Sequence, residues 1–338
     1  MLSYIGRRIM LSVLVIIGLS VVTFLIARVV PSDPAARYAG PKATVEQIAA
    51  AKQELGLDKP LPVQYVRYMA GVLRGDLGTS ITTHNKVAQD IRGTLPPSLE
   101  LIVLGMLIAL AAGIPVGVLG AMKPGSWIDG FGRLAAVVLV SFPSFCLGFV
   151  LQLLLYDWLH LLPVSGRVSN LAMVLHPVEA RTGFYLIDSA LAGNWSFFGD
   201  ALSHLLLPAL TLAAYPFGLV VRMVRASMVE VLAQDHTRLL KALGMKLPKI
   251  AFRYAFKLTL PALLTVIALS FAYSLTGTFL IESVFGWPGM GDYVSKALIT
   301  NDYPAVMGTT LLIGIVYIGL NLIVDLGIAF VDPRVRWS

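Results

Sequence analysis

Charged side chains are scarce in this sequence. They make up 13% of its 338 residues, and Asp and Glu together number only 19, whereas a soluble protein carries about 25% charged residues. The single cysteine, Cys146, lies in an apolar stretch and has no partner for an internal disulfide. So few acids cannot solvate a globule of this size, and hydrophobic residues make up 57% of the chain. The composition therefore indicates an integral membrane protein.

Residue patterns for common catalytic and cofactor sites are also missing. No Lys directly follows a Gly, so the chain has no P-loop for nucleotide phosphates. No H-E-x-x-H pattern or cysteine pair offers a metal site, and the histidines are scattered. No paired carboxylates or histidine cluster support a membrane-embedded enzyme. We therefore expect no bound cofactor, no metal and no catalysis by this chain.

Six apolar stretches are long enough to cross the hydrocarbon core of a bilayer, which takes about 20 helical residues. They are Ile9–Val30, Leu99–Met122, Leu134–Trp158, Leu205–Met223, Leu258–Ile281 and Val306–Phe330. The fourth contains Pro208 and Pro216, which neighbouring helices can accommodate. The sequence predicts an all-α integral membrane protein with six transmembrane helices.

The basic residues predict its orientation. If the N-terminus is cytoplasmic, the inner loops hold most of the bases, with a dense cluster between Arg222 and Lys257. The two short outer loops hold only Arg167, Arg181 and Lys296. Both termini are therefore expected in the cytoplasm. The net charge of +7 largely follows from this asymmetry, so we expect no nucleic-acid partner.

These assignments divide the chain into three parts. Residues 1–98 are expected to form an anchor helix and a long outer loop, residues 99–331 a transmembrane core with a cytoplasmic loop at 224–258, and residues 332–338 a cytoplasmic tail. In the outer loop, Thr44 and Gln47 form a capping-box pattern at a helix start. A second helix is expected at Val63–Leu73.

The cytoplasmic loop contains the segment RLLKALGMKLPKIAFRYAFKLTLP (238–261). An amphipathic helix is predicted from about Ser227 to Leu243, with Gly244 just beyond its end and Pro248 in the first turn of a second helix. The apolar stripe of the first helix would comprise Leu232, His236, Leu239, Leu240 and Leu243. In the second helix, the bases would share one face, which suits an anionic headgroup surface: Lys249, Arg253 and Lys257. Such helices either cover the membrane surface or dock into a groove of a partner protein.

This segment resembles the cytoplasmic loop of permease subunits of ATP-binding-cassette importers. RLLKALG stands where that family has its E-A-A…G signature, and Leu260-Pro261 where it has a leucine-proline pair. Arg238 replaces the glutamate, which is similar to the peptide branch of the family. Lys257-Leu258-Thr259 departs from the expected Arg-Asn-Ala.

Further motifs resemble the peptide branch along almost the whole chain. In order, they are PSDP (31–34), ELGLDKPLPVQY (54–65), GDLGTS (75–80), GIPVG (113–117), LLPVSGR (161–167), ESVFGWPGMG (282–291) and NDYP (301–304). Each is weak alone, but their common order is specific. The chain resembles the first permease subunit of dipeptide, oligopeptide, glutathione and nickel importers.

The resemblance implies the fold of a type I importer permease in a bacterial cytoplasmic membrane. It implies four kinds of partner: a second homologous permease subunit, two cytoplasmic ATPases that use ATP and Mg, an extracytoplasmic solute-binding protein and membrane lipid. Di- and oligopeptides are the implied substrates. The residues carried over as the ATPase-coupling helix are Asp235, Arg238, Leu239, Leu240, Lys241, Ala242, Leu243 and Gly244. Those carried over for docking of the binding protein are Gly75, Asp76, Arg167, Trp287, Pro288 and Asp302.

The fifth apolar stretch contains a mildly polar stripe. Ser270, Ser274 and Thr278 recur every four residues, with Tyr273 beside them. This stripe would suit a translocation path for zwitterionic peptides, but small residues also drive helix packing in lipid, and we favour packing. Gly113 and Gly117, spaced four apart, are more clearly a packing pattern.

Charge within the spans is rare, and Asp325 in the last span is the exception. Asn321 lies one turn before it on the same helix face. The pair is either a proton or ion site, which would fit an ion-coupled carrier or channel, or polar glue between helices. Glu100 and Asp157 fall near the expected outer ends of their spans, where we expect water to reach them.

Overall fold

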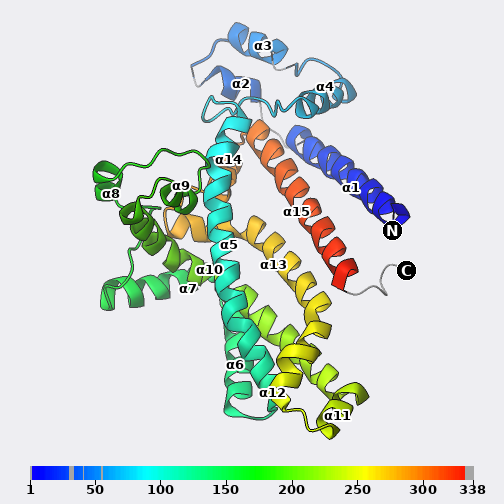
Figure 1. Cartoon of the computed structure of the whole chain (residues 1–338). Coiled ribbons are helices and arrows are strands. Elements are labelled where there is room, and N and C mark those ends of the chain that lie inside the picture. Colours follow the sequence, from blue (N-terminus) through cyan, green and yellow to red (C-terminus); the bar gives the residue numbers. More distant parts are fainter. Residues whose placement is uncertain (1, 30–33, 41, 55, 332–338) are drawn as a thin grey trace. The chain divides into compact units, whose positions relative to one another are not determined.

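The computed structural model describes residues 2–29, 34–40, 42–54 and 56–331. The expected cytoplasmic tail 332–338 lies outside these residues, as do Pro31–Asp33 of the PSDP motif. The described residues form helices and loops, without a named strand. Figure 1 shows the helices in chain order. They are α1 (Leu2–Val29), α2 (Pro34–Ala39), α3 (Val45–Glu54), α4 (Leu61–Leu73), α5 (Val87–Met122), α6 (Trp127–Ser141), α7 (Ser144–Gln152), the π-helical η1 (Leu153–Trp158), α8 (Asn170–Leu175), α9 (Tyr185–Leu191), α10 (Trp195–Ala233), α11 (Asp235–Ala242), α12 (Leu247–Lys249), the π-helical η2 (Ile250–Ala255), α13 (Phe256–Val284), α14 (Met290–Ile299) and α15 (Tyr303–Val331).

Five described segments are long and apolar enough to cross a membrane, and a bent helix pair makes a sixth if it counts as one span. The five are Gly6–Ala27, Val87–Met122, Trp195–Ala233, Leu247–Val284 and Tyr303–Gly327. Each overlaps one of the six predicted spans, and three of them begin ten or more residues before the predicted start. The prediction of an all-α membrane protein is confirmed.

The third predicted span, Leu134–Trp158, is wrong as a single helix. Its two halves, Trp127–Ser141 and Ser144–Trp158, meet at an angle of 107°. Phe142 has extended backbone angles (φ −80°, ψ 128°) because the ring of the following Pro143 disfavours the helical conformation in the residue before it. Pro208 and Pro216, by contrast, lie inside the continuous α10, as predicted.

The chain divides into two compact units. The first contains residues 1–96 and 289–318, and the second contains residues 97–288 and 319–338. The three topological parts inferred from the sequence concern the sides of the membrane and stay a prediction.

In the first unit, the outer-loop helices form as the sequence predicts. Thr44 and Gln47 make the reciprocal capping-box hydrogen bonds at the start of α3, and α4 covers the predicted helix Val63–Leu73. Phe24 of α1 packs with Tyr65 and Tyr68 of α4 in one apolar cluster. The long loop is therefore packed against α1 through α4.

In the second unit, α5, α6 and α13 pack around the long helix α10. Gly113 and Gly117 permit the close approach of α5, because a Cβ at either position would lie only 3.0 and 2.9 Å from side-chain atoms of Val220 and Val224 in α10. The packing role inferred for these glycines is confirmed. Gly218 of α10 makes an equally close approach to α6.

Candidate functional site

The cytoplasmic loop begins with a break that the sequence analysis missed. A single helix was expected from about Ser227 to Leu243, but α10 ends at Ala233 and α11 starts at Asp235. Gln234 between them is extended (ψ 156°). The buried Thr237 Oγ1 donates a hydrogen bond of 2.9 Å to the carbonyl of Val231, so it ties α11 to the end of α10.

The end of α11 agrees with the sequence. Gly244 has a φ of +81°, a conformation that side chains with a Cβ rarely adopt. Its N–H donates to the Lys241 carbonyl, and Met245 N–H donates to the Leu240 carbonyl. These two bonds form a Schellman motif, which satisfies the last carbonyls of the helix. Pro248 then lies in the first turn of α12, as predicted, and the helix runs through η2 into α13.

The apolar stripe predicted for this helix is only partly buried. Leu232 and Leu240 are half-buried, and Thr237 is the residue of α11 that packs inside. Leu239 and Leu243 are 60% and 73% exposed. Together with Asp235 they are spaced four residues apart, so they share one outward face of α11. The break at Gln234 turned this face away from the core.

The polar residues of α11 and the following bases lie at the surface. Arg238 pairs with Asp235 at 3.4 Å, but both side chains are exposed, so the pair adds little stability. Lys241, Ala242 and His236 are exposed as well. Beyond Gly244, the predicted basic face is exposed along its length: Lys249, Arg253 and Lys257.

The predicted translocation stripe separates into two sets. Ser270, Ser274 and Thr278 are buried in α13, which favours the packing interpretation. Tyr273 flanks this stripe and is 56% exposed, with its ring stacked on Tyr215 of α10 at 4.4 Å between centroids.

The residues assigned to binding-protein docking also separate by exposure. Gly75, Asp76 and Pro288 are exposed. Trp287 is buried, and its Nε1 donates to the Pro97 carbonyl at 3.0 Å. Asp302 is buried and accepts hydrogen bonds from Ser80 Oγ and Thr82 N. The buried members therefore hold their loops in place, and the exposed members lie at the surface.

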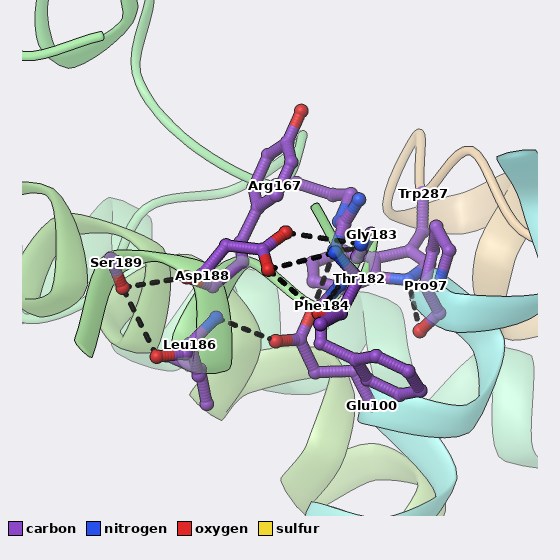
Figure 2. Close-up of polar contacts among 11 residues, drawn as sticks. Pro97, Glu100, Arg167, Thr182, Gly183, Phe184, Leu186, Asp188, Ser189 and Trp287 are labelled. Atoms are coloured by element: carbon purple, nitrogen blue, oxygen red, sulfur yellow. Dashed lines mark hydrogen bonds and ion pairs between the residues drawn. The ribbon is translucent and has the colours of Figure 1, made fainter. Parts of the chain in front are cut away.

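A buried ion pair forms the centre of what we call the outer segment of the second unit, named for the side of the membrane that the sequence predicts for it. It comprises residues 159–194 with the adjoining parts of α5 and α13. Arg167 Nη2 lies 2.7 Å from Glu100 Oε2, and both side chains are less than 9% exposed. The expectation that water reaches Glu100 is therefore wrong. The other carboxylate oxygen, Oε1, accepts from Leu186 N, and the Arg167 guanidinium lies 3.6 Å from the centre of the Tyr185 ring. Figure 2 shows these contacts around the amino end of α9.

The loop before α9 is held by a second carboxylate, that of Asp188. Thr182 N, Thr182 Oγ1 and Gly183 N all donate to it (Figure 2). Burial acts to raise the pKa of Asp188, but these hydrogen bonds outweigh it and hold the pKa below its ordinary value. Arg167 also donates to the Gly183 carbonyl at 3.0 Å, which joins the two carboxylate sites.

Glu100 and Arg167 were not paired by the sequence analysis because they lie 67 residues apart in the chain. Arg167 was selected only through its motif, and Glu100 was treated as a solvated residue. The one usable signal was a carboxylate at the start of an apolar run with few other charges, where burial requires a partner. Burial also requires a partner at the end of an apolar run, where the buried Glu282 accepts from Ser98 Oγ at 2.5 Å.

The remaining polar candidates lie in the last helix. Asp325 and Asn321 are half-buried on α15, and Asp325 makes a polar or electrostatic interaction. Among the described residues, no group of three or more His, Cys, Asp or Glu side chains is placed to hold a metal.

Two family models match this sequence and together cover most of it. The model described as "Binding-protein-dependent transport system inner membrane component" matches residues 113–337. The model for the N-terminal part of such membrane components matches residues 1–101.

Relatives match over their full length. The chain is 41% identical over 323 residues to the probable D,D-dipeptide transport system permease protein DdpB of Escherichia coli, covering 96% of this chain and 94% of that protein. It is 40% identical over 337 residues to the dipeptide transport system permease protein DppB of Escherichia coli, covering 99% of each. It is 31% identical over 338 residues to the glutathione transport system permease protein GsiC of Salmonella paratyphi A, covering 100% of each. The chain therefore belongs to the binding-protein-dependent transport system inner membrane components, the permease subunits of ATP-binding-cassette importers, and is a multi-pass protein of the bacterial inner membrane.

Proposed function

We propose that this chain is the permease subunit of an importer for dipeptides and other short peptides. The support is the high identity over the whole chain to permease proteins named for dipeptide transport. The relative named for glutathione is less similar. No feature of the described structure favours the alternative of an ion-coupled carrier built on Asp325 and Asn321.

We also propose that α11 is the helix through which ATP hydrolysis drives transport. The observation that carries this proposal is the exposed face of Asp235, Leu239 and Leu243. These two leucines lie on a short helix outside the apolar spans. Their exposure to water is unfavourable, and a partner protein that covered them would gain free energy from their burial. The hydrogen bond from Thr237 to Val231 fixes α11 to α10, and the Schellman motif at Gly244 fixes its other end. A displacement of α11 would therefore be passed on to both α10 and α13.

The assembly that follows contains three other kinds of protein. A second permease subunit would complete the membrane core, and two cytoplasmic ATPases, using ATP and Mg, would dock on the α11 helices of the two permeases. An extracytoplasmic binding protein would deliver the peptide to the outer loops, at the exposed backbone near Gly75, Asp76 and Pro288. Arg167, Trp287 and Asp302 would keep those loops in shape.

The docking proposal is tested by placing charge on the exposed leucine face. In the double variant Leu239→Asp/Leu243→Asp, the ATPase subunits should no longer co-purify with the permease, because two carboxylates would be buried at the interface without partners. Leu171→Asp is the matched control, since Leu171 in α8 is 68% exposed and lies in the outer segment. Normal co-purification of the double variant would overturn the placement of the docking helix.

The transport proposal is tested with the whole complex in proteoliposomes. Uptake of a radiolabelled dipeptide should require ATP and the binding protein and should be insensitive to an ion gradient. Uptake that follows a proton or sodium gradient without ATP would refute it and favour the carrier hypothesis. ATP-dependent uptake of glutathione but of no dipeptide would correct the substrate and leave the importer assignment intact.

A further inference from the structure

A groove lined by arginines lies between α6, α10 and α13, a volume of about 560 Å³. Arg133 of α6 and both Arg222 and Arg225 of α10 line it. Arg133 and Arg222 stand at the ends of two predicted spans, Leu134–Trp158 and Leu205–Met223. The fold therefore brings together basic residues that the sequence places at the inner boundary of the hydrocarbon core.

The charge of this groove is not balanced by its own residues. Asp129, which is buried, pairs with Arg225 through both carboxylate oxygens, with the Nη2 to Oδ2 distance at 3.0 Å. Arg133 Nε lies 3.7 Å from the same carboxylate and is 58% exposed. No carboxylate lines the groove itself. Once Asp129 is paired with Arg225, the other two guanidinium groups leave an excess of positive charge.

The walls of the groove are apolar on the side away from the arginines. Val137 and Leu219 line it together with Val266 of α13. Val137 follows Arg133 by one helical turn, about 6 Å along α6, and Leu219 precedes Arg222 by three residues on α10, which runs in the opposite direction. Both therefore lie deeper in the expected hydrocarbon core than the arginines do.

We propose that this groove binds one anionic phospholipid on the cytoplasmic side of the membrane. The phosphate would lie between the guanidinium groups of Arg133 and Arg222, whose planar forks match phosphate oxygens, and an acyl chain would lie along Val137, Leu219 and Val266. Basic pockets between transmembrane helices bind such headgroups. A zwitterionic peptide fits less well, because its ammonium group would need an acid and the lining offers none.

The bound lipid would sit against the end of α10 that leads to α11. Arg225, within the groove, is held by Asp129, and Asp129 Oδ2 also accepts from Gly125 N in the loop before α6. The headgroup would therefore bind to a region that α5, α6 and α10 already fix. The lipid would stabilise the inner ends of these helices beside the ATPase-docking helix.

The test measures lipid binding to the intact transporter with its partner subunits. Delipidated complex would be titrated with phosphatidylglycerol, with phosphatidylcholine as the neutral lipid, and bound lipid counted by native mass spectrometry. Phosphatidylglycerol should bind in preference. Each arginine near the headgroup contributes a factor of about five in affinity, so Arg133→Gln/Arg222→Gln should weaken binding about thirtyfold.

Two further variants separate the groove from the general charge of the inner surface. Lys246→Gln removes one exposed base that does not line the groove and should leave this binding unchanged. Val137→Trp keeps every charge but fills the groove from an exposed position, and it should weaken phosphatidylglycerol binding. An equal loss in Lys246→Gln, or no loss in the double arginine variant, would overturn the proposal.

Other occupants would be recognised by separate outcomes. In a Cys146→Ser background, a Val137→Cys variant that cross-links to the second permease subunit would show that protein fills the groove, and the lipid proposal would fall. A raised KM for peptide in Arg222→Gln, with phosphatidylglycerol binding unchanged, would assign the arginines to the cargo instead and would equally overturn it.

Discussion

Replacing Arg167 with Met tests how the outer segment is held. The change would leave the Glu100 carboxylate buried without a counter-charge, and breaking a buried ion pair from one side costs about 3–5 kcal/mol. The loop before α9 would also lose the hydrogen bond from Arg167 to the Gly183 carbonyl. We therefore expect this segment to open locally far more often, while the helices packed on α10 stay folded.

Hydrogen–deuterium exchange measures that opening directly. Because each 1.4 kcal/mol is a factor of ten, the amides of residues 182–191 should exchange about 100- to 4,000-fold faster in Arg167→Met than in the wild type. Arg181→Met is the matched control. Arg181 pairs with Glu179 in the same segment, but both side chains are more than 70% exposed, so its loss should change exchange little.

A double variant separates the ion pair from the loss of side-chain volume. Glu100→Leu alone should destabilise the segment by more than the loss of the ion pair. The Leu186 N–H would also lose its acceptor, which costs about 1–3 kcal/mol. Arg167→Met/Glu100→Leu removes both charges, so it should be less destabilised than the two single changes added together. Additive effects, or unchanged exchange in Arg167→Met, would refute the role given to this pair.

Three other changes follow from the same structure. Gly244→Val should uncouple ATP hydrolysis from peptide uptake while the complex still assembles, because a residue with a Cβ in the left-handed conformation costs about 1–2 kcal/mol. Normal coupling in this variant would count against the role proposed for α11. The stabilisation that Asp188 gives to its loop should be complete above pH 3.8, its ordinary pKa, and should be lost as the pH falls through the lower folded pKa, which amide exchange of residues 182–184 would detect. Ser270→Ala should leave peptide uptake unchanged, because the buried serine only packs, whereas Tyr273→Ala should alter uptake, because the exposed ring lines the path. The opposite result would favour the serine stripe as the translocation path.

Local signals in the sequence were sufficient for several elements. Gly244 and Pro248 act through their own backbone preferences, so the end of α11 and the start of α12 follow from the residues themselves. The capping box at Thr44 and Gln47 is equally local. The span lengths follow from the thickness of the hydrocarbon core.

Features that depend on tertiary contacts could not be predicted from the sequence. Pro143 ends a helix, whereas Pro208 lies within one, and no local pattern separates them, because the outcome depends on what packs against the freed backbone groups. The partner of Glu100 is 67 residues farther along the chain. The break at Gln234 was missed for the same reason: the helical pattern continues through it, and the anchoring of Thr237 on Val231 appears only in the folded chain.

The second unit combines a segment held by buried polar pairs with a helix, α11, that exposes apolar side chains. Its outer segment is held by buried pairs, Glu100 with Arg167 and Ser98 with Glu282, so that segment would transmit a displacement of the helix ends without deforming. At the other end, α11 exposes its leucines yet is tied to α10 and runs through Gly244 into α13. Because α10 and α13 also pack along each other, a force on α11 would move them together. If ATPases dock on α11 as proposed, this arrangement favours rocking of a helix pair over bending of a single helix.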